Sequence, residues 1–272
     1  YTGANYTDGS VNFNNLSAET IGIVTADSAG GLGLSAFTGG FANDGSVLIT
    51  DESGSWAVKA NGSTVARLTD PVAGSDAVQL TLRNGDGTSV TDTLTSVEAI
   101  RFADFAGAQL DLTAGKVTGI RGSSVSDKIG LSTRAVTSID AGAGVDTLMA
   151  KWASAGEVLT LDAGATLVLN TDATGWHLKT SNNVKLMDVV QKAPGENWYD
   201  VTVWSDATHS LTHAARNIEA INLKQLNQYK GNLSGNALLT GDADLTLRLP
   251  DTSAPVFTLM SITLATSAEA MV

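Results

Sequence analysis

The residues best suited to chemistry lie in a glycine- and aspartate-rich segment near the middle of the chain. Residues 141–148, AGAGVDTL, fit the nonapeptide G-G-x-G-x-D-x-U-x with one glycine replaced by alanine. Glycines allow tight turns whose carbonyl oxygens point at a cation, and the aspartate adds a carboxylate. Gly142, Gly144 and Asp146 are therefore candidate contributors to a calcium site.

A weaker copy of the pattern comes earlier in the same segment. Residues 122–129, GSSVSDKI, keep the aspartate and a following apolar residue. Asp127 and Asp146 are 19 residues apart, close to the roughly 18 residues of two nonapeptides, so we expect both in one column of a parallel β-roll. Ordinary glycine and aspartate turns are the alternative. The candidate metal-binding residues are Asp127, Asp140, Gly142, Gly144, Asp146, Asp242 and Asp244. The last two belong to a third, weaker copy of the pattern.

The remaining ionisable residues form no recognisable catalytic motif. His209 and His213 have the i, i+4 spacing of a helical zinc pair, but Ser210 replaces the glutamate of H-E-x-x-H. The chain has no cysteine, which excludes disulfides, cysteine nucleophiles and cysteine-based metal sites. Glu98 and Glu219 stand at equivalent positions, where a carboxylate that accepts backbone N–H groups is more expected than a catalytic one. We therefore expect a protein that is not an enzyme.

Two tryptophans, Trp56 and Trp176, also stand at equivalent positions, each after a predicted hairpin turn. An exposed indole there would offer a platform for a sugar ring, whereas a buried indole would close the core or pack across strands. Burial is the commoner outcome at such a position, and sugar binding stays open as the speculative alternative.

These equivalences come from an internal repeat. Three blocks recur in the same order at offsets of 120, 121 and 121, so a single inserted residue reconciles them. We interpret the pattern as one β-rich unit copied once. The aligned pairs are 46–59 with 166–179, 78–91 with 199–212, and 96–102 with 217–223.

The hydrophobic pattern within both copies has the period of β-strands. Val78, Leu80 and Leu82 alternate with polar residues, and residues 199–204 repeat the alternation. Residues 213–226 suit a helix as well, but we expect strand. The prediction is an all-β fold of two duplicated units, sandwich or β-roll/solenoid-like, joined by the Gly/Asp-rich segment. The expected parts are 1–115 (first unit), 116–150 (junction), 151–235 (second unit) and 236–272 (C-terminal strands or an export-signal-like tail).

The composition argues against several classes of binding partner. The 28 acidic side chains exceed the 16 basic ones and give a formal net charge of −12. The basic residues form no cluster, which argues against nucleic acid and anionic lipid. No apolar run is long enough for membrane insertion.

The junction, together with residues 91–105, TDTLTSVEAIRFADF, resembles the hemolysin-type calcium-binding, or RTX, class of exported bacterial proteins over about a third of the chain. The resemblance implies type I secretion without a cleaved leader, and ordering of the repeats by extracellular calcium. Only residues 141–148 are a good copy of the repeat, and a full calcium roll stacks several.

The expected function is therefore a calcium-responsive structural or adhesive protein at a bacterial surface, such as a surface-layer, matrix or adhesin component. It would self-assemble or pack against neighbouring surface proteins through its β-rich repeats. The alternatives are a carbohydrate-binding module with polysaccharide as partner, and the non-catalytic RTX tail of a larger secreted hydrolase.

Overall fold

The computed structural model describes most of the chain between residues 47 and 249 together with one short N-terminal strand. Nearly all of the regular structure in this part is β-strand, which confirms the all-β prediction. The described residues are 20–23, 47–52, 54–60, 62–71, 73–83, 89–94, 99–102, 108–153, 159, 161–162, 164–172, 174–193, 196–229, 233–235, 239–241 and 245–249.

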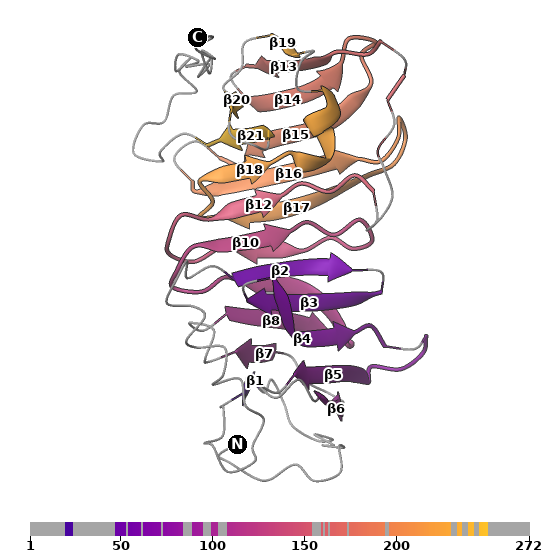
Figure 1. Ribbon diagram of the computed structural model, residues 1–272, viewed down its shortest axis with the longest axis vertical. Coiled ribbons are helices and arrows are strands. Elements are labelled where there is room, and N and C mark those ends of the chain that lie inside the picture. The colour runs from indigo at the N-terminus through magenta and orange to yellow at the C-terminus, as the bar shows by residue number, and fades with distance from the viewer. Residues whose placement is uncertain are drawn as a thin grey trace, which may run out of the picture.

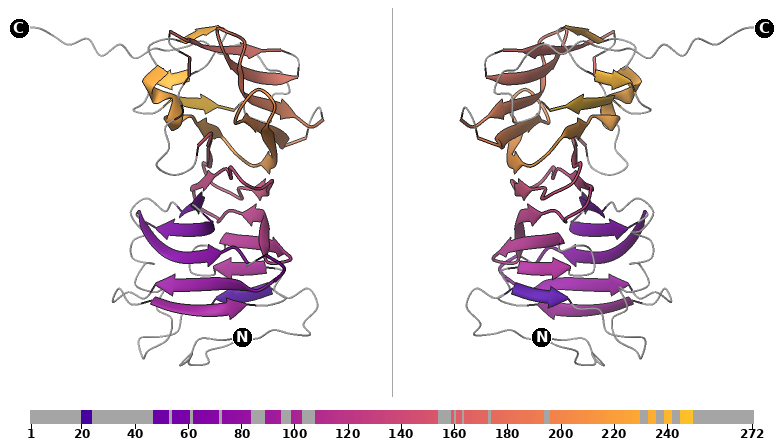
Figure 2. Two further views of the ribbon diagram at one scale, coloured as in Figure 1. Left: turned by 90° about the vertical axis from the view of Figure 1, so that its right-hand side faces the viewer. Right: turned by 90° about the vertical axis from the view of Figure 1, so that its left-hand side faces the viewer.

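The strands form two large mixed sheets that face each other along the long axis of the molecule (Figures 1 and 2). Sheet A contains, in spatial order, β20 (Leu239–Gly241), β21 (Leu245–Arg248), β18 (Ala220–Asn222), β12 (Thr147–Met149), β10 (Asp127–Gly130), β2 (Val47–Glu52), β3 (Ser55–Ala60), β4 (Ser63–Thr69), β5 (Val78–Arg83) and β6 (Ser89–Leu94). Sheet B contains β1 (Thr20–Ile23), β7 (Ala99–Phe102), β8 (Ala108–Thr113), β9 (Lys116–Arg121), β11 (Ser138–Asp140), β17 (Ser210–Arg216), β16 (Trp198–Trp204), β15 (Lys185–Gln191), β14 (Gly175–Thr180), β13 (Leu167–Thr171) and β19 (Leu233–Gly235).

The middle of the molecule is a short parallel roll. From β9 to β12 the chain alternates between sheet B and sheet A, and each strand pairs in parallel with the strand one full turn away. Lys128 lies opposite Thr147, and Gly119 lies opposite Ser138, so one turn of the roll takes 19 residues in both sheets. These four strands fall within residues 116–150, the expected junction.

An antiparallel meander extends the roll at each end. The first meander, β2 to β6, continues sheet A, because β2 pairs in parallel with β10. The second, β13 to β17, continues sheet B, because β17 pairs in parallel with β11. For residues 213–226, the expected strand is present at β17 and β18, but Lys224 to Leu226 belong to a 3-10 helix, η1 (Lys224–Tyr229), where the strand prediction is wrong.

The two meanders agree in detail. Each has a register shift at the same place in its second strand, after Val58 in β3 and after Leu178 in β14, at the offset of 120. Thr81 and Thr91 share a hydroxyl hydrogen bond of 2.9 Å, and the corresponding bond of 2.8 Å joins residues 202 and 212 at the offset of 121. These matches support the duplication, which stays a prediction.

The core lies between the two sheets. In β5 the side chains of Val78, Leu80 and Leu82 are buried, while Gln79 and Arg83 are exposed, as the period-2 pattern predicts. In the parallel strands of the roll, Ile129 and Leu148 are fully buried at consecutive levels of one stack. One continuous hydrophobic cluster therefore runs through both meanders and the roll.

Candidate functional site

A column of acidic side chains stands at one edge of the roll, where the strands of sheet A begin. Asp127 is the first residue of β10, Asp146 directly precedes β12, and Glu219 directly precedes β18. The parallel register places these residues at consecutive levels, because Lys128, Thr147 and Ala220 lie opposite one another. Figure 1 shows the strands β2, β10, β12 and β18 stacked in this order.

Each carboxylate in the column accepts the backbone N–H of the level below. Val47 N–H donates to the Asp127 carboxylate. Asp127 N–H donates to Asp146 Oδ1 over 2.7 Å, and Asp146 N–H donates to Glu219 Oε2 over 2.6 Å. The column therefore caps the backbone donors at the start of three stacked strands, β2, β10 and β12, which would otherwise be buried without partners.

The carboxylates of the column differ in the number of hydrogen bonds that they accept. Both oxygens of Asp127 accept from Ser123, one from its N–H and one from its hydroxyl over 2.9 Å. Burial raises the pKa of Asp127 to about 6, although these hydrogen bonds oppose the rise. Asp146 is 1% exposed, and its Oδ2 has no hydrogen-bond partner. Burial, with added repulsion from Asp127 and Glu219, raises the pKa of Asp146 to about 7.

The glycines of the junction let successive turns of the chain touch. Gly142 has φ = 93° and Gly144 has φ = 139°, in the region that L residues rarely adopt. A Cβ on Gly142 would lie 2.3 Å from the carbonyl oxygen of Ser123, in the turn below. Ala143 N–H donates to that same oxygen over 3.3 Å. The turns are therefore held together by direct backbone contact.

Asp140 does not belong to the column. It ends β11 in sheet B, where its carboxylate pairs with Arg216 and accepts from the Asn217 amide over 2.7 Å. Burial raises the pKa of Asp140, but Arg216 and Asn217 outweigh this effect and leave it below the ordinary value. The spacing of the sequence could not distinguish this ion pair from a metal ligand.

The geometry of the column suits hydrogen bonding better than calcium coordination. Calcium takes six to eight oxygen ligands. The oxygens of Asp127 already accept N–H or O–H groups, and one oxygen each of Asp146 and Glu219 does the same. Within the described ranges, no three His, Cys, Asp or Glu side chains gather closely enough to hold a metal ion. Asp242 and Asp244 lie outside the described residues, and calcium binding stays a prediction.

Glu219 is the member of the column that the sequence reasoning did not place there. The expectation that it accepts backbone N–H groups is confirmed by its bond from Asp146, whereas Glu98 lies outside the described residues. A signal was available: Asp127, Asp146 and Glu219 each begin the tripeptide acid-x-Ile or acid-x-Leu, in which the aliphatic residue is buried.

Trp56 and Trp176 do not form the exposed sugar platform that was the speculative alternative for them. Trp56 is 2% exposed and Trp176 is 9% exposed, so both indoles belong to the core and neither face is available to a ligand. The two lie in like surroundings, since each occupies the second position of a hairpin's return strand.

Other aromatic side chains point outward. Trp198 and Trp204 are partly exposed on β16 and carry cations over their rings, Arg216 at 4.8 Å from the Trp198 centroid and Lys185 at 4.8 Å from that of Trp204. Asp188 joins Trp204 Nε1, at 3.1 Å, to His177 Nδ1, at 2.8 Å. Of these residues, His177, Lys185 and Asp188 line a shallow hollow of about 450 Å³ on the outer face of sheet B.

The two histidines of HSLTH do not form a pair. His209 is exposed at the turn before β17 and bonds to Asp206 over 2.7 Å, whereas His213 is fully buried and its Nδ1 lies 2.9 Å from Thr137 Oγ1. The helical geometry that the i, i+4 spacing needs is absent, because the residues from Ser210 onward are strand.

No family model, curated protein or solved structure matches the chain. No helix in the described portion is both long and apolar enough to cross a bilayer.

Proposed function

We propose that the protein is a non-enzymatic structural or adhesive component of a bacterial surface, which assembles through its sheet edges. One observation carries the proposal: a single pair of hydrogen-bonded sheets runs from one meander through the roll to the other (Figure 1). Both meanders share one hydrophobic core with the roll. Such a body transmits force along its axis without a hinge, which suits a spacer or a lattice subunit.

The ends of the sheets support assembly. Among the described strands, β6 has a neighbour on one side only, and so does β20 at the other end of sheet A. An edge strand presents free N–H and C=O groups that can pair with a strand of a second molecule. Sheet A could thus continue from one copy to the next.

The repeat supplies a matched pair of variants to test edge pairing. Thr91 and Thr212 are both exposed and each makes the equivalent threonine–threonine hydrogen bond, but β6 is an edge strand while β17 lies between β11 and β16. A lysine at an edge opposes strand addition. We expect Thr91→Lys to prevent concentration-dependent growth measured by light scattering, whereas Thr212→Lys leaves it unchanged.

The same measurement, repeated in EDTA and in calcium, tests the predicted response to the ion. Growth in calcium that EDTA reverses would support the RTX-like interpretation of the junction, and equal growth in both would remove calcium from the proposal. A protein that stays monomeric at every concentration, in both buffers, would contradict the assembly function itself.

A carbohydrate-binding module is the second candidate, favoured by the outward-facing rings of Trp198 and Trp204. Partly exposed indoles beside polar side chains are a common surface for sugars. Replacement of both by alanine should abolish retention on a neutral polysaccharide without loss of thermal stability. Unchanged retention would exclude this candidate.

A further inference from the structure

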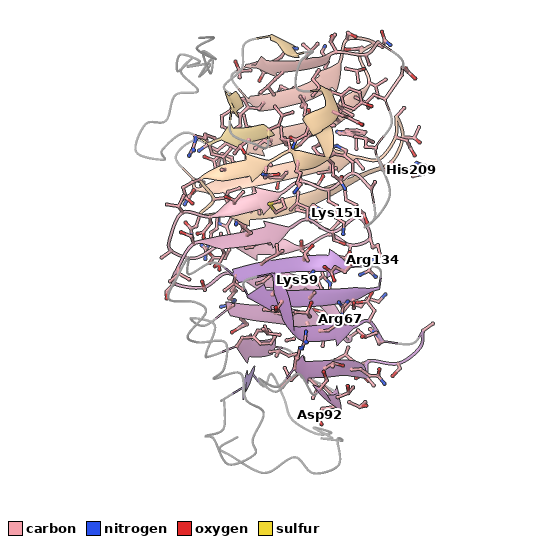
Figure 3. The ribbon with its side chains drawn as sticks, in the orientation of Figure 1. Lys59, Arg67, Asp92, Arg134, Lys151 and His209 are labelled. Atoms are coloured by element: carbon pink, nitrogen blue, oxygen red, sulfur yellow. The ribbon has the colours of Figure 1, made fainter. Side chains whose placement is uncertain are left out.

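A cavity lies at the edge of the roll opposite the acidic column. The turn after β10, the turn after β12 and the β16–β17 hairpin enclose a cavity of about 230 Å³. Figure 3 shows Arg134, Lys151 and His209 along this edge of the molecule. The three come from three separate segments, which only the fold brings together.

The lining is basic in an acidic protein. Arg134, Lys151 and His209 contribute to the wall, and no Asp or Glu is among the described residues that line it. The whole chain carries a formal net charge of −12. Arg134 is already paired with Asp51 and Asp70, and His209 is paired with Asp206, so Lys151 is the cation of the wall that is left for an incoming anion.

Lys151 is the cation that an incoming anion would meet. Its ammonium group donates to the carbonyl oxygen of Asp51 and has no carboxylate partner within ion-pair distance among the described residues. The Asp51 carboxylate is already committed, because it binds the Arg134 guanidinium and accepts from the Ser132 hydroxyl over 2.7 Å. Burial lowers the pKa of Lys151, and the nearby charges of Asp51 and Glu52 oppose this fall only in part.

The rest of the lining has the mixed character that sugars need. The hydroxyl groups of Thr133, Ser205 and Ser210 offer hydrogen bonds, and Val203 and Leu211 give an apolar wall. Trp152 is fixed beside them by its Nε1–H bond of 2.8 Å to the Leu186 carbonyl. The volume is below the roughly 300–1,000 Å³ of sites for drug-sized ligands, so the cavity suits a single sugar residue.

We propose that this cavity binds one uronic acid residue of an acidic polysaccharide, with the sugar carboxylate on Lys151 and ring hydroxyls on the surrounding serine and threonine side chains. Binding at this site needs only one copy of the chain, so it is independent of the assembly proposed above.

The test is retention of the full chain on polygalacturonate, measured by affinity electrophoresis with dextran as the neutral reference. Lys151→Gln keeps a polar side chain with N–H donors, one bond shorter than that of lysine, but removes the charge. Lys116→Gln removes the same charge from an exposed position on β9. Ser210→Tyr fills the mouth of the cavity without changing Lys151, and thermal unfolding checks that each variant folds.

We expect Lys151→Gln and Ser210→Tyr to weaken retention on polygalacturonate about tenfold, as for a lost charged hydrogen bond. Lys116→Gln should match the wild type, and dextran should not retain any of the proteins. An equal loss in Lys116→Gln, or equal retention on dextran, would overturn the proposal.

Competition separates a sugar from a simple anion. Free galacturonate should release the protein from polygalacturonate at concentrations where inorganic phosphate does not. If phosphate competes equally well, the cavity is a general anion site and the assignment to a uronic acid is wrong.

Discussion

Replacement of Asp146 by asparagine tests whether the acidic column works by hydrogen bonding. Asparagine keeps an oxygen that can accept the Asp127 N–H group. In the wild type, the nitrogen of this group lies 2.7 Å from Asp146 Oδ1. Its amide nitrogen takes the place of Oδ2, which is buried without a partner. The substitution therefore removes an uncompensated buried charge and adds donors beside the carboxylates of Asp127 and Glu219, whose charges repel that of Asp146.

The pKa of Asp146 sets the magnitude and its dependence on pH. A rise from 3.8 to about 7 on folding means that the charged form destabilises the fold, at about 1.4 kcal/mol per unit of pKa, by up to ~4 kcal/mol. The protonated wild type escapes this penalty below pH 4 and suffers it fully above pH 7. Asp146→Asn should thus be more stable than the wild type at pH 8, and the advantage should vanish near pH 4.

The assay is urea unfolding of both proteins in EDTA at several pH values. Asp140→Asn is the control, because Asp140 is paired with Arg216 and its pKa is lowered, so this variant should lose stability at pH 8. If Asp146→Asn is less stable than the wild type at pH 8 without a metal, the buried charge of Asp146 does not destabilise the fold. If its advantage is the same at pH 4 and pH 8, ionisation of Asp146 is not the cause.

Two further predictions concern the roll and the strand β17 that pairs with it. His213 is buried and burial lowers its pKa from 6.5 to about 4, so the fold loses stability as the pH falls below 6.5, because only the unfolded state then takes up the proton. The wild type should lose about 3 kcal/mol relative to His213→Gln between pH 6.5 and pH 4, measured by urea unfolding, and a constant difference would contradict this. Deletion of 128–146 removes one 19-residue turn and joins Asp127 to Thr147 in the same register, so the protein should still fold by circular dichroism. Deletion of 128–137 removes half a turn and should abolish folding, because all later strands would enter the wrong sheet. Equal outcomes for the two deletions would contradict the 19-residue period of the roll.

Local features of the fold could be predicted from the sequence. The alternation of Val78, Leu80 and Leu82 depends only on the two faces of one strand, and the structure reproduces it. The 19-residue separation of Asp127 and Asp146 likewise follows from the length of one turn, which places them at neighbouring levels. Both inferences need no knowledge of distant parts of the chain.

The partners of these residues could not be predicted in the same way. The Asp127 carboxylate accepts from Val47 N–H, and Asp146 N–H donates to Glu219, across separations of 80 and 73 residues. Such contacts exist only after β2 and β18 have paired with the roll. The nonapeptide pattern identifies an oxygen-rich turn, but both a cation and a backbone N–H satisfy carboxylate oxygen, and the sequence alone does not choose between them.

The path of the chain explains why the two meanders occupy opposite sheets. After the first meander in sheet A, the chain visits sheet B (β7 to β9), sheet A (β10), sheet B (β11) and sheet A (β12) before the second meander begins in sheet B. The number of crossings between the meanders is odd, so equivalent outer faces point to opposite sides of the molecule. After the second meander the chain crosses again, and Glu219 directly precedes β18, the first strand after this crossing. Under the proposed duplication, the copied block therefore brings the acidic residue that accepts Asp146 N–H from the level below, and this allows a whole meander to enter the roll without interrupting the column.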